Sequence, residues 1–432
     1  MINLVDFNRI FEEVKNLDRE RIMELMRTLI NIDTTVPPGN SYRKYVDTIS
    51  PYFKYLGYNL EEVIVPEELI KQIPYPLEGP RINLVATKEF NQEKYVTFCG
   101  HMDVVPASDE GNEKWRFPPF EATMIKSGKI YGRGVGDNKG PMICLILALQ
   151  IIEKLKLTPK YNIRVLNCTD EEIGIYPGLR YLAEQGYVKG TVFSIDYGIE
   201  PMILVGASGV LDIEINTIGR SSHSGLSLLG VNALEEMVPI LVELIDLKKK
   251  VELRQSKEIP GFPDPKTKEK RNLSPLFNLD VIKSGEKANI IPDLCKLMIN
   301  RRVIPDESIE EVKAEIIEAI KRGKAKSKAL DVRIKFEYSN PPVKVDINSP
   351  EIQRIIKVIQ LVHKIPEEKI HITGLNLTFD VGFVAQILKT QEIIIRGVAT
   401  AGSNTHGVNE TIRLKDIKKF IKEIIMFLCA DI

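Results

Sequence analysis

The order of apolar segments along the chain is the feature that most restricts its fold. Between residues 82 and 196, short strand-like runs alternate with helical patterns. The runs are INLVATKEF, KYVTFCGH, YNIRVLNC and GTVFSID, and the helical patterns are GPMICLILALQIIEKLK and GLRYLAEQGY. This alternation predicts an α/β domain with a central mixed, mainly parallel sheet. Ligands bind beyond the carboxyl ends of strands in such sheets, so a site is expected there.

The pattern changes near residue 207. LDIEINTIG alternates like a half-exposed strand, and NALEEMVPILVELIDLKK has the spacing of an amphipathic helix. The strands LFNLDVIKSG and DLCKLMINRRV follow, then the helix SIEEVKAEIIEAIKR and the strand DVRIKFEY. This β-α-β-β-α-β order predicts a ferredoxin-like α+β domain. We expect LDIEINTIG to be an outer strand of this domain. Either this strand or the domain's exposed helices would meet a second copy across a twofold axis.

The helix–strand alternation returns after residue 340 and ends in a helix from about Leu414. At 432 residues the chain exceeds the usual size of one domain. We therefore predict a first domain at residues 1–206, an inserted domain at 207–340, and the completion of the first domain at 341–432. The Lys- and Pro-rich stretch at 250–276 is interpreted as a solvated loop.

Charge and hydropathy exclude several classes of partner. Lys+Arg and Asp+Glu number 59 each, so no net field favours a nucleic acid or an anionic membrane. No apolar run approaches the roughly 20 residues needed to span a bilayer, and no secretion signal opens the chain. The scattered cysteines predict reduced core thiols; they are Cys99, Cys144, Cys168, Cys295 and Cys429. We expect a cytoplasmic protein.

Carboxylates and imidazoles follow the predicted strands at one edge of the sheet. They are His101, Asp103, Asp137, Asp170, Glu171, Glu172, Asp196 and His406. Clustered acids repel one another unless cations hold them together. This set suits two zinc, cobalt or manganese ions, which together can lower the pKa of a water to roughly 7. Of the adjacent Glu171 and Glu172, one could bind metal while the other accepts a proton.

The motifs GHMDVVP, GRGVGDNKG, TDEEIG, FSID and THGVNE, in this order, carry a family resemblance. They resemble the metallopeptidase family of acetylornithine deacetylase, succinyl-diaminopimelate desuccinylase, aminoacylase, glutamate carboxypeptidase and the cytosolic dipeptidases. GRSSHSG and ANIIPD…NRR match further motifs, so the resemblance covers nearly the whole chain. It implies a zinc-peptidase-like catalytic domain, interrupted by a lid and dimerisation domain of a homodimer.

The resemblance also implies roles for individual residues. Two divalent ions, zinc before cobalt or manganese, would bind to His101, Asp137, Glu172, Asp196 and His406. Asp137 would bridge both ions, with His101 and Asp196 on one and Glu172 and His406 on the other. Asp103 would orient His101. A cis peptide would follow Asp137.

Three further roles concern the substrate. Glu171 would be the general base. His223 of a partner subunit would donate to the oxyanion. Arg302, alone or with Asn289, would hold a free carboxylate through its forked guanidinium.

The predicted reaction is metal-dependent hydrolysis of an amide bond. Biosynthetic deacylases of the family mostly carry Glu where this chain has Asp196, which favours a dipeptidase, carboxypeptidase or aminoacylase. The substrate would be a short peptide or an N-acyl amino acid with a free carboxylate. A biosynthetic deacylase and a non-catalytic binding protein remain alternatives. TGLNLTFDVGF departs from the family's Gly-Gly-Thr/Ser-Asp segment, so Asp380 receives no role.

Overall fold

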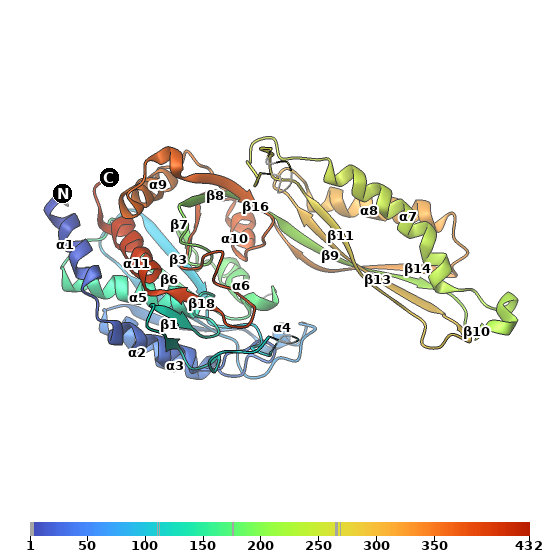
Figure 1. The fold of residues 1–432 in the computed structure, drawn as a ribbon, viewed down its shortest axis with the longest axis horizontal. Coiled ribbons are helices and arrows are strands. Elements are labelled where there is room, and N and C mark those ends of the chain that lie inside the picture. Colours follow the sequence, from blue (N-terminus) through green and yellow to red (C-terminus); the bar gives the residue numbers. More distant parts are fainter. Residues whose placement is uncertain (1–3, 110, 112, 175–176, 264–266, 268) are drawn as a thin grey trace. The chain divides into compact units, whose positions relative to one another are not determined.

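The computed structural model describes residues 4–109, 111, 113–174, 177–263, 267 and 269–432. The chain forms two compact units (Figure 1). Unit 1 contains the residues up to Ile203 together with Val345–His371 and Phe383–Ile432, and unit 2 contains Leu204–Lys344 and Ile372–Gly382. The predicted domain boundaries at 206/207 and 340/341 lie close to the two ends of the segment Leu204–Lys344. The segment Ile372–Gly382, however, groups with unit 2 and not with the continuation of the first domain.

A small sheet explains this difference. In it, β8 (Met202–Ala207) lies between β15 (Val343–Lys344) and β16 (His371–Leu375). β8 and β15 lie where the chain passes from one unit to the other, and β16 joins them in one sheet. The sequence pattern does not connect β16 with the other two strands. The side-chain hydroxyl of Ser208 adds to this link by donating to Asn376 Oδ1 at 2.7 Å.

Six strands form the central sheet of unit 1, in the order β1-β2-β6-β3-β7-β17. Their bounds are β1 (Asn59–Ile64), β2 (Ile82–Lys88), β3 (Tyr95–His101), β6 (Asn162–Cys168), β7 (Thr191–Ser194) and β17 (Ile393–Ile395). β3 pairs in parallel with β6 and β7, and β7 with β17, whereas the β1–β2 and β2–β6 pairs are antiparallel. The predicted mixed, mainly parallel sheet is confirmed. Its inner strands are continuous apolar runs because both faces are buried.

Helices surround this sheet (Figure 1). They are α1 (Leu4–Lys15), α2 (Arg19–Ile30), α3 (Tyr42–Tyr55), α4 (Glu67–Ile70), α5 (Lys139–Lys154), α6 (Leu179–Glu184), α9 (Pro350–His363), α10 (Val381–Leu388) and α11 (Leu414–Cys429). α5 is buried along most of its length and packs against β3 and α11. Among the described residues, no helix is both long and apolar enough to cross a membrane. The cysteines are free and buried, as predicted.

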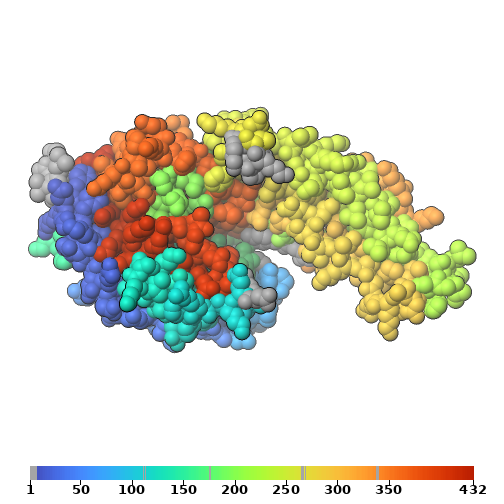
Figure 2. All heavy atoms as spheres, viewed as in Figure 1, coloured from blue at the N-terminus to red at the C-terminus, as the bar shows by residue number. Residues whose placement is uncertain are grey.

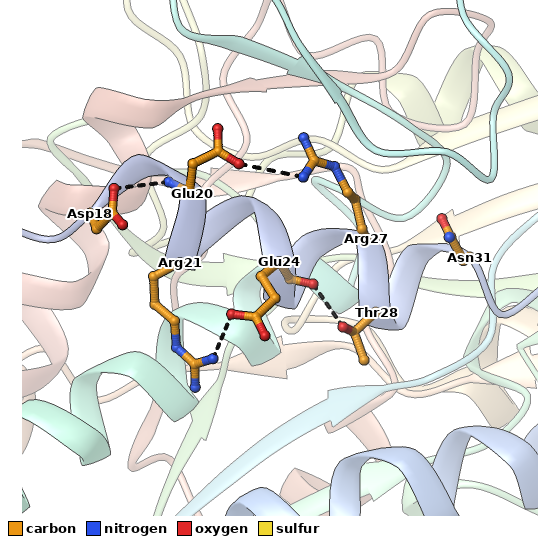
Figure 3. A pocket seen from close by; sticks show the side chains of 7 residues that line it. All are labelled: Asp18, Glu20, Arg21, Glu24, Arg27, Thr28 and Asn31. Carbon is orange, nitrogen blue, oxygen red and sulfur yellow. Dashed lines mark hydrogen bonds and ion pairs between the residues drawn. The ribbon is translucent and has the colours of Figure 1, made fainter.

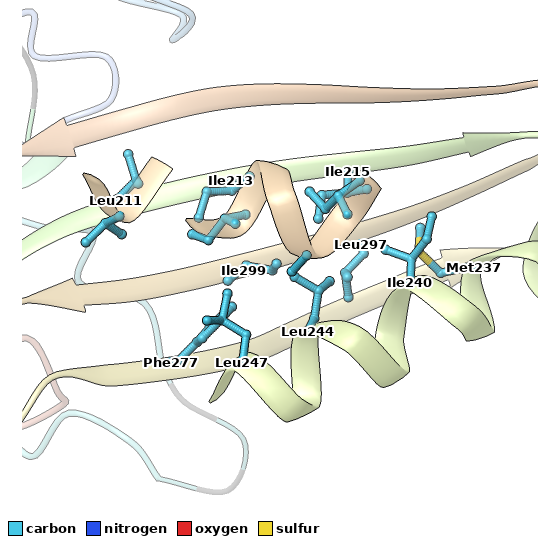
Figure 4. Packing of buried hydrophobic residues seen from close by; sticks show 14 of the residues in the cluster. Leu211, Ile213, Ile215, Met237, Ile240, Leu244, Leu247, Phe277, Leu297 and Ile299 are labelled. Atoms are coloured by element: carbon cyan, nitrogen blue, oxygen red, sulfur yellow. The ribbon is translucent and has the colours of Figure 1, made fainter. Parts of the chain in front are cut away.

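Unit 2 is a four-stranded antiparallel sheet with two helices. The strands are β9 (Gly209–Ile218), β11 (Leu276–Ser284), β13 (Leu294–Val303) and β14 (Asp331–Asn340), and the helices are α7 (Ala233–Glu252) and α8 (Ile309–Lys324). The strand order β11-β13-β9-β14 and the β-α-β-β-α-β sequence confirm the ferredoxin-like prediction. Leu244 and Leu247 of α7 pack toward Phe277, Leu297 and Ile299 in the core (Figure 4).

One expectation about this sheet is wrong. β9, the strand LDIEINTIG, is paired along its length with β13 on one side and β14 on the other. It is therefore a central strand, and β11 and β14 form the edges. Alternation of apolar and polar residues reports that one face of a strand is buried, but it carries no information about which strands lie beside it.

Candidate metal centre

The strand ends of unit 1 bring the predicted acids and imidazoles together. His101 is the last residue of β3, directly opposite Cys168 at the end of β6. The turn η1 (Glu171–Ile173) follows β6, and Asp196 follows β7. Asp137 lies just before α5, and His406 lies between β17 and β18 (Thr411–Arg413). Parallel strands place their carboxyl ends at one edge, so residues far apart in sequence converge there.

The described residues contain two overlapping groups that could each hold a metal ion. Ligand atoms of His101, Asp137 and Asp196 all lie within 4.8 Å of one another, and so do those of Asp137, Glu172 and His406. Asp137 belongs to both groups. Its Oδ1 lies 2.8 Å from His101 Nε2, and its Oδ2 lies 3.1 Å from His406 Nε2. The arrangement offers one shared carboxylate between two subsites.

The electrostatics of these groups follow from burial and mutual contact. Burial alone would raise the pKa of Asp137, but hydrogen bonds with His101 and His406 hold it well below its usual value. The contacts with Asp137 and Glu172 raise the pKa of His406 to about 11. Burial, and then the charge of Asp137, raise the pKa of Glu172 to about 7. In the metal-free protein, protons on His406 and Glu172 therefore offset the negative charge of the clustered carboxylates.

The donor set fits divalent cations. Imidazole nitrogens and carboxylate oxygens are ligands for zinc, cobalt and manganese. Glu172 Oε2 lies 3.0 Å from His406 Nε2, whereas its buried Oε1 has no hydrogen-bond partner. A buried carboxylate oxygen without a partner costs free energy, and a cation would satisfy it.

The two neighbouring glutamates differ in their surroundings. The Glu172 side chain is 3% exposed, whereas the Glu171 side chain is 17% exposed. Glu171 Oε2 lies 4.0 Å from His101 Nε2, at the limit of an ion pair. The geometry therefore offers Glu172 as a group inside the cluster and Glu171 as a group beside it that solvent can reach.

Asp103 contacts both sides of the cluster. Its backbone oxygen lies 3.1 Å from His101 Nδ1, and its Oδ1 lies 3.6 Å from the same nitrogen. Its Oδ2 accepts a hydrogen bond from the backbone N–H of Glu172 at 2.9 Å. The fully buried Asp103 thus fixes the far side of the His101 ring and the turn that carries Glu172.

The peptide bond between Asp137 and Asn138 is cis, as the resemblance implied. Asn138 has a place that sequence reasoning missed. Its Oδ1 accepts from the His101 backbone N–H at 3.3 Å, and its Nδ2 donates to the Ile195 carbonyl at 3.0 Å. It therefore joins the ends of β3 and β7, where His101 and Asp196 stand. Its position next to Asp137 was the signal available.

The predicted substrate residues lie in unit 2. His223 in β10 (Ser222–His223) is exposed and pairs across with Ile290 of β12 (Ile290–Ile291), which follows Asn289. Arg302 lies on β13, where Nε donates to Asn300 Oδ1 at 3.1 Å. From the start of β13 at residue 294 to Arg302 the strand extends by about 26 Å. Asn289 precedes the residue-294 end of this strand, and Arg302 lies near its other end.

One hollow of unit 1 lies along α2 (Figure 3). Its lining comprises Asp18, Glu20, Arg21, Glu24, Arg27, Thr28 and Asn31. Four of its charged side chains form two ion pairs, with 2.7 Å between Arg21 and Glu24 and 3.6 Å between Arg27 and Glu20. None of the predicted site residues lines it, so it offers no competing site.

Comparisons with known proteins agree with this geometry. Residues 97–428 match peptidase family M20/M25/M40. The chain is 24% identical to the N-formyl-4-amino-5-aminomethyl-2-methylpyrimidine deformylase of Bacillus subtilis, over 95% of each chain. It is 30% identical to the acetylornithine deacetylase of Vibrio campbellii, over 69% of this chain and 71% of that one.

A solved structure agrees in fold. The M20 family metallo-carboxypeptidase of Sulfolobus solfataricus superimposes with a TM-score of 0.73 at 20% identity, covering 95% of this chain and 98% of that one. The similarity thus extends over both units of the chain.

Proposed function

This chain belongs to peptidase family M20/M25/M40, a family of metallohydrolases, and on that basis we propose that it hydrolyses an amide bond in a short peptide or N-acyl amino acid with a free carboxylate. The observation that carries the proposal is the pair of ligand groups that share Asp137. His101 and Asp196 would hold one divalent ion, and Glu172 and His406 the other. We propose zinc, with cobalt or manganese as substitutes.

The residues of the cluster divide the chemistry. When bound, the two ions supply Lewis acidity at the strand ends. Glu171 takes a proton from the attacking water and returns it to the leaving nitrogen. Its partial exposure and its place beside His101 support this role. Asp103 keeps the His101 ring oriented and the Glu172 turn in place.

Recognition of the substrate carboxylate is assigned to Arg302. Its Nη1 donates to Thr378 Oγ1 at 2.6 Å, and Asn300 accepts from its Nε. Asn300 in turn donates to Asp212 Oδ1 at 2.6 Å. These neighbours hold the guanidinium plane, and a planar, fixed fork suits a carboxylate. Thr378 comes from the segment TGLNLTFDVGF, which had received no role.

A homodimer through unit 2 completes the proposal. The outer side of α7 carries an apolar stripe whose members Leu234, Val238, Val242 and Ile245 are between 41% and 51% exposed. Such a stripe is typical of a protein–protein interface. A second copy on this side could supply His223 and Asn289, which lie together on β10 and before β12. Sedimentation of Val242→Glu as a monomer beside dimeric wild type would support it.

The five buried, free cysteines support a cytoplasmic location. Nothing in the balanced charge supports a nucleic-acid or membrane partner.

The test is turnover of metal-replete protein against dipeptides, N-acetyl amino acids, N-acetylornithine, N-succinyl-diaminopimelate and a formylated aminopyrimidine, with a chelated sample as the blank. Chelator-sensitive hydrolysis of dipeptides or N-acetyl amino acids supports the proposal. Amidating the free carboxylate should raise KM, and more so for wild type than for Arg302→Met. Protein that holds metal but hydrolyses none of these compounds would refute it.

A deacylase is the second candidate. The identities to an acetylornithine deacetylase and to a deformylase support it, because both named reactions release an amine from an acyl group. Asp196, where biosynthetic deacylases mostly carry Glu, argues against it. Preference for N-acetylornithine, N-succinyl-diaminopimelate or the formylated pyrimidine would select this candidate.

A further inference from the structure

The carboxylate of Glu410 is saturated with hydrogen bonds inside unit 1. Its Oε1 accepts from the backbone N–H groups of Gly136 at 2.8 Å and Asp137 at 3.2 Å. Its Oε2 accepts from the Gly134 N–H at 3.0 Å and from Arg133 Nη1 at 2.9 Å. A carboxylate has about four acceptor positions. Glu410 therefore has no lone pair left for a cation, although it lies next to a metal-ligand loop.

Arg133 extends this contact to the second loop. Its Nη2 donates to the backbone carbonyl of His406 at 2.9 Å and to that of Pro106 at 3.1 Å. Arg133 is 1% exposed and Glu410 is fully buried. One buried ion pair thus ties the loop that carries Asp137 to the loop that carries His406.

The two imidazoles of the cluster differ in how they are held. The His101 side chain is 2% exposed and Asp103 lies against its far nitrogen. The His406 side chain is 54% exposed, and its ring contacts are to Asp137 and Glu172 within the cluster itself. Packing therefore fixes His101, whereas His406 depends on its own loop for its position.

We propose that Arg133 and Glu410 are positioning residues that set the distance between Asp137 and His406, and so build the Asp137–Glu172–His406 subsite. This inference rests on the proposed function. A buried ion pair contributes little net stability compared with apolar residues of the same size. The pair instead makes directional hydrogen bonds with three backbone N–H groups and two backbone carbonyls, and these bonds fix the positions of the loops. Metal subsites depend on such bonds from the residues behind their ligands.

The chain's single tryptophan provides a reporter. The guanidinium carbon of Arg133 lies 5.2 Å from the centroid of the Trp115 ring. Asn409 holds the Trp115 segment by accepting from the Arg116 N–H at 2.6 Å and donating to the Lys114 carbonyl at 3.0 Å. Figure 2 shows the red 400–413 stretch beside the teal 113–131 stretch at the surface. A shift of Arg133 should therefore change Trp115 fluorescence.

The experiment titrates metal-free full-length protein with Co²⁺ and follows both heat and Trp115 fluorescence. Glu410→Gln keeps the shape of the side chain, but its amide NH₂ group would face N–H donors where Glu410 has an accepting oxygen. Arg133→Lys keeps the charge but loses the fork that reaches Glu410 and His406 together. Glu423→Gln is the matched control, because Glu423 forms a similarly buried pair with Arg396, and the Arg396 side chain donates to the Glu200 and Met202 carbonyls and, as far as the described residues go, to no predicted ligand.

We expect wild type and Glu423→Gln to bind two ions. Glu410→Gln and Arg133→Lys should keep the first ion within about twofold and bind the second about 10- to 100-fold more weakly. In these two variants, the change in Trp115 fluorescence that accompanies binding of the second ion should also be lost. Should Glu410→Gln fail to fold, Arg133→Lys decides alone. Wild-type affinity for both ions, or equal loss of both, in a folded variant would overturn the inference. Wild type that binds no Co²⁺ would instead refute the proposed function.

Discussion

The imidazole of His406 lies 3.0 Å from the carboxylate of Glu172, although the His406 side chain is 54% exposed and the Glu172 side chain only 3%. In the metal-free protein, the hydrogen bond with Asp137 and then this contact with Glu172 raise the pKa of His406 to about 11. Burial raises the pKa of Glu172 to about 7. At pH 7, His406 therefore holds a proton and Glu172 holds one in about half of the molecules, and a divalent cation must displace these protons.

Metal binding should therefore release protons. Cation ligands must be deprotonated. Burial alone would lower the pKa of His101, but hydrogen bonds to Asp103 and Asp137 outweigh burial and raise it as well. We therefore expect about two to three protons released per protein at pH 7 as both subsites fill. The apparent affinity for Zn²⁺ should rise with pH. Calorimetric titration in buffers that differ in ionisation enthalpy measures the number of protons. Binding that releases none, with affinity constant between about pH 6 and 8, would contradict the assignment of His406 and Glu172 as ligands.

The metal-free protein should lose stability as pH rises. The folded-state pKa of Glu172 lies above its ordinary 4.5, so its contribution is complete below about 4.5 and is lost as pH passes through about 7. His406 acts in the same direction between about 6.5 and 11. The urea midpoint of metal-free protein should thus fall from about pH 5 to 9. Adding Zn²⁺ at the upper end should reverse the fall. A urea midpoint that rises with pH between about 5 and 9 would contradict the raised pKa values of Glu172 and His406.

Glu171→Gln should separate catalysis from metal binding. Glu171 lies at the edge of the cluster, 4.0 Å from His101 Nε2, while Glu172 lies inside it. We expect kcat to fall about 10²- to 10⁴-fold because the proton acceptor is lost, with the metal content unchanged. Glu172→Gln is the comparison, since it should weaken binding of one ion. Metal loss in Glu171→Gln, or retained turnover, would reverse the assignment of the two glutamates.

Much of this centre could be predicted from the sequence because strand ends are local signals. His101 ends an apolar run, Asp196 ends another, and parallel strands bring both ends to one edge whatever the loops between them do. The ferredoxin-like order of unit 2 was readable for the same reason, since each element has its own period.

The parts that could not be predicted depend on neighbours in space. The alternation of β9 gave no sign that it lies between β13 and β14. Glu410 bonds backbone N–H groups in a glycine-rich loop that lies 273 to 276 residues earlier in the sequence, and no periodicity reports such a contact. Its place at the end of the motif THGVNE, four residues after His406, was a signal that sequence reasoning did not use. Arg81 offered no such signal, because it stands just before β2 and far in sequence from the predicted site residues.

Arg81 nevertheless reaches the residue that precedes both glutamates. Its Nε donates to Asp170 Oδ2 at 3.2 Å, and the Tyr42 hydroxyl donates to Asp170 Oδ1 at 3.0 Å. Arg81 and Asp170 are fully buried. Asp170 has a φ of 58°, a left-handed conformation that turns the chain from β6 into the Glu171 turn. The side chain and the backbone of Asp170 could each fix this turn.

Asp170→Gly separates these two possibilities. Glycine adopts positive φ without cost, so the backbone conformation remains available while the side-chain anchor is lost. If the anchor matters, kcat at saturating metal should fall at least about tenfold, and the unpaired Arg81 should cost about 3 to 5 kcal/mol of stability. Asp170→Gly combined with Arg81→Met removes the unpaired charge, but also the hydrogen bonds of Arg81 to the Glu78, Gly79 and Pro38 carbonyls. It should therefore recover part of the stability in urea but not kcat. Recovery of both would mean that the pair acts on stability alone, and full activity of Asp170→Gly would leave only the backbone role.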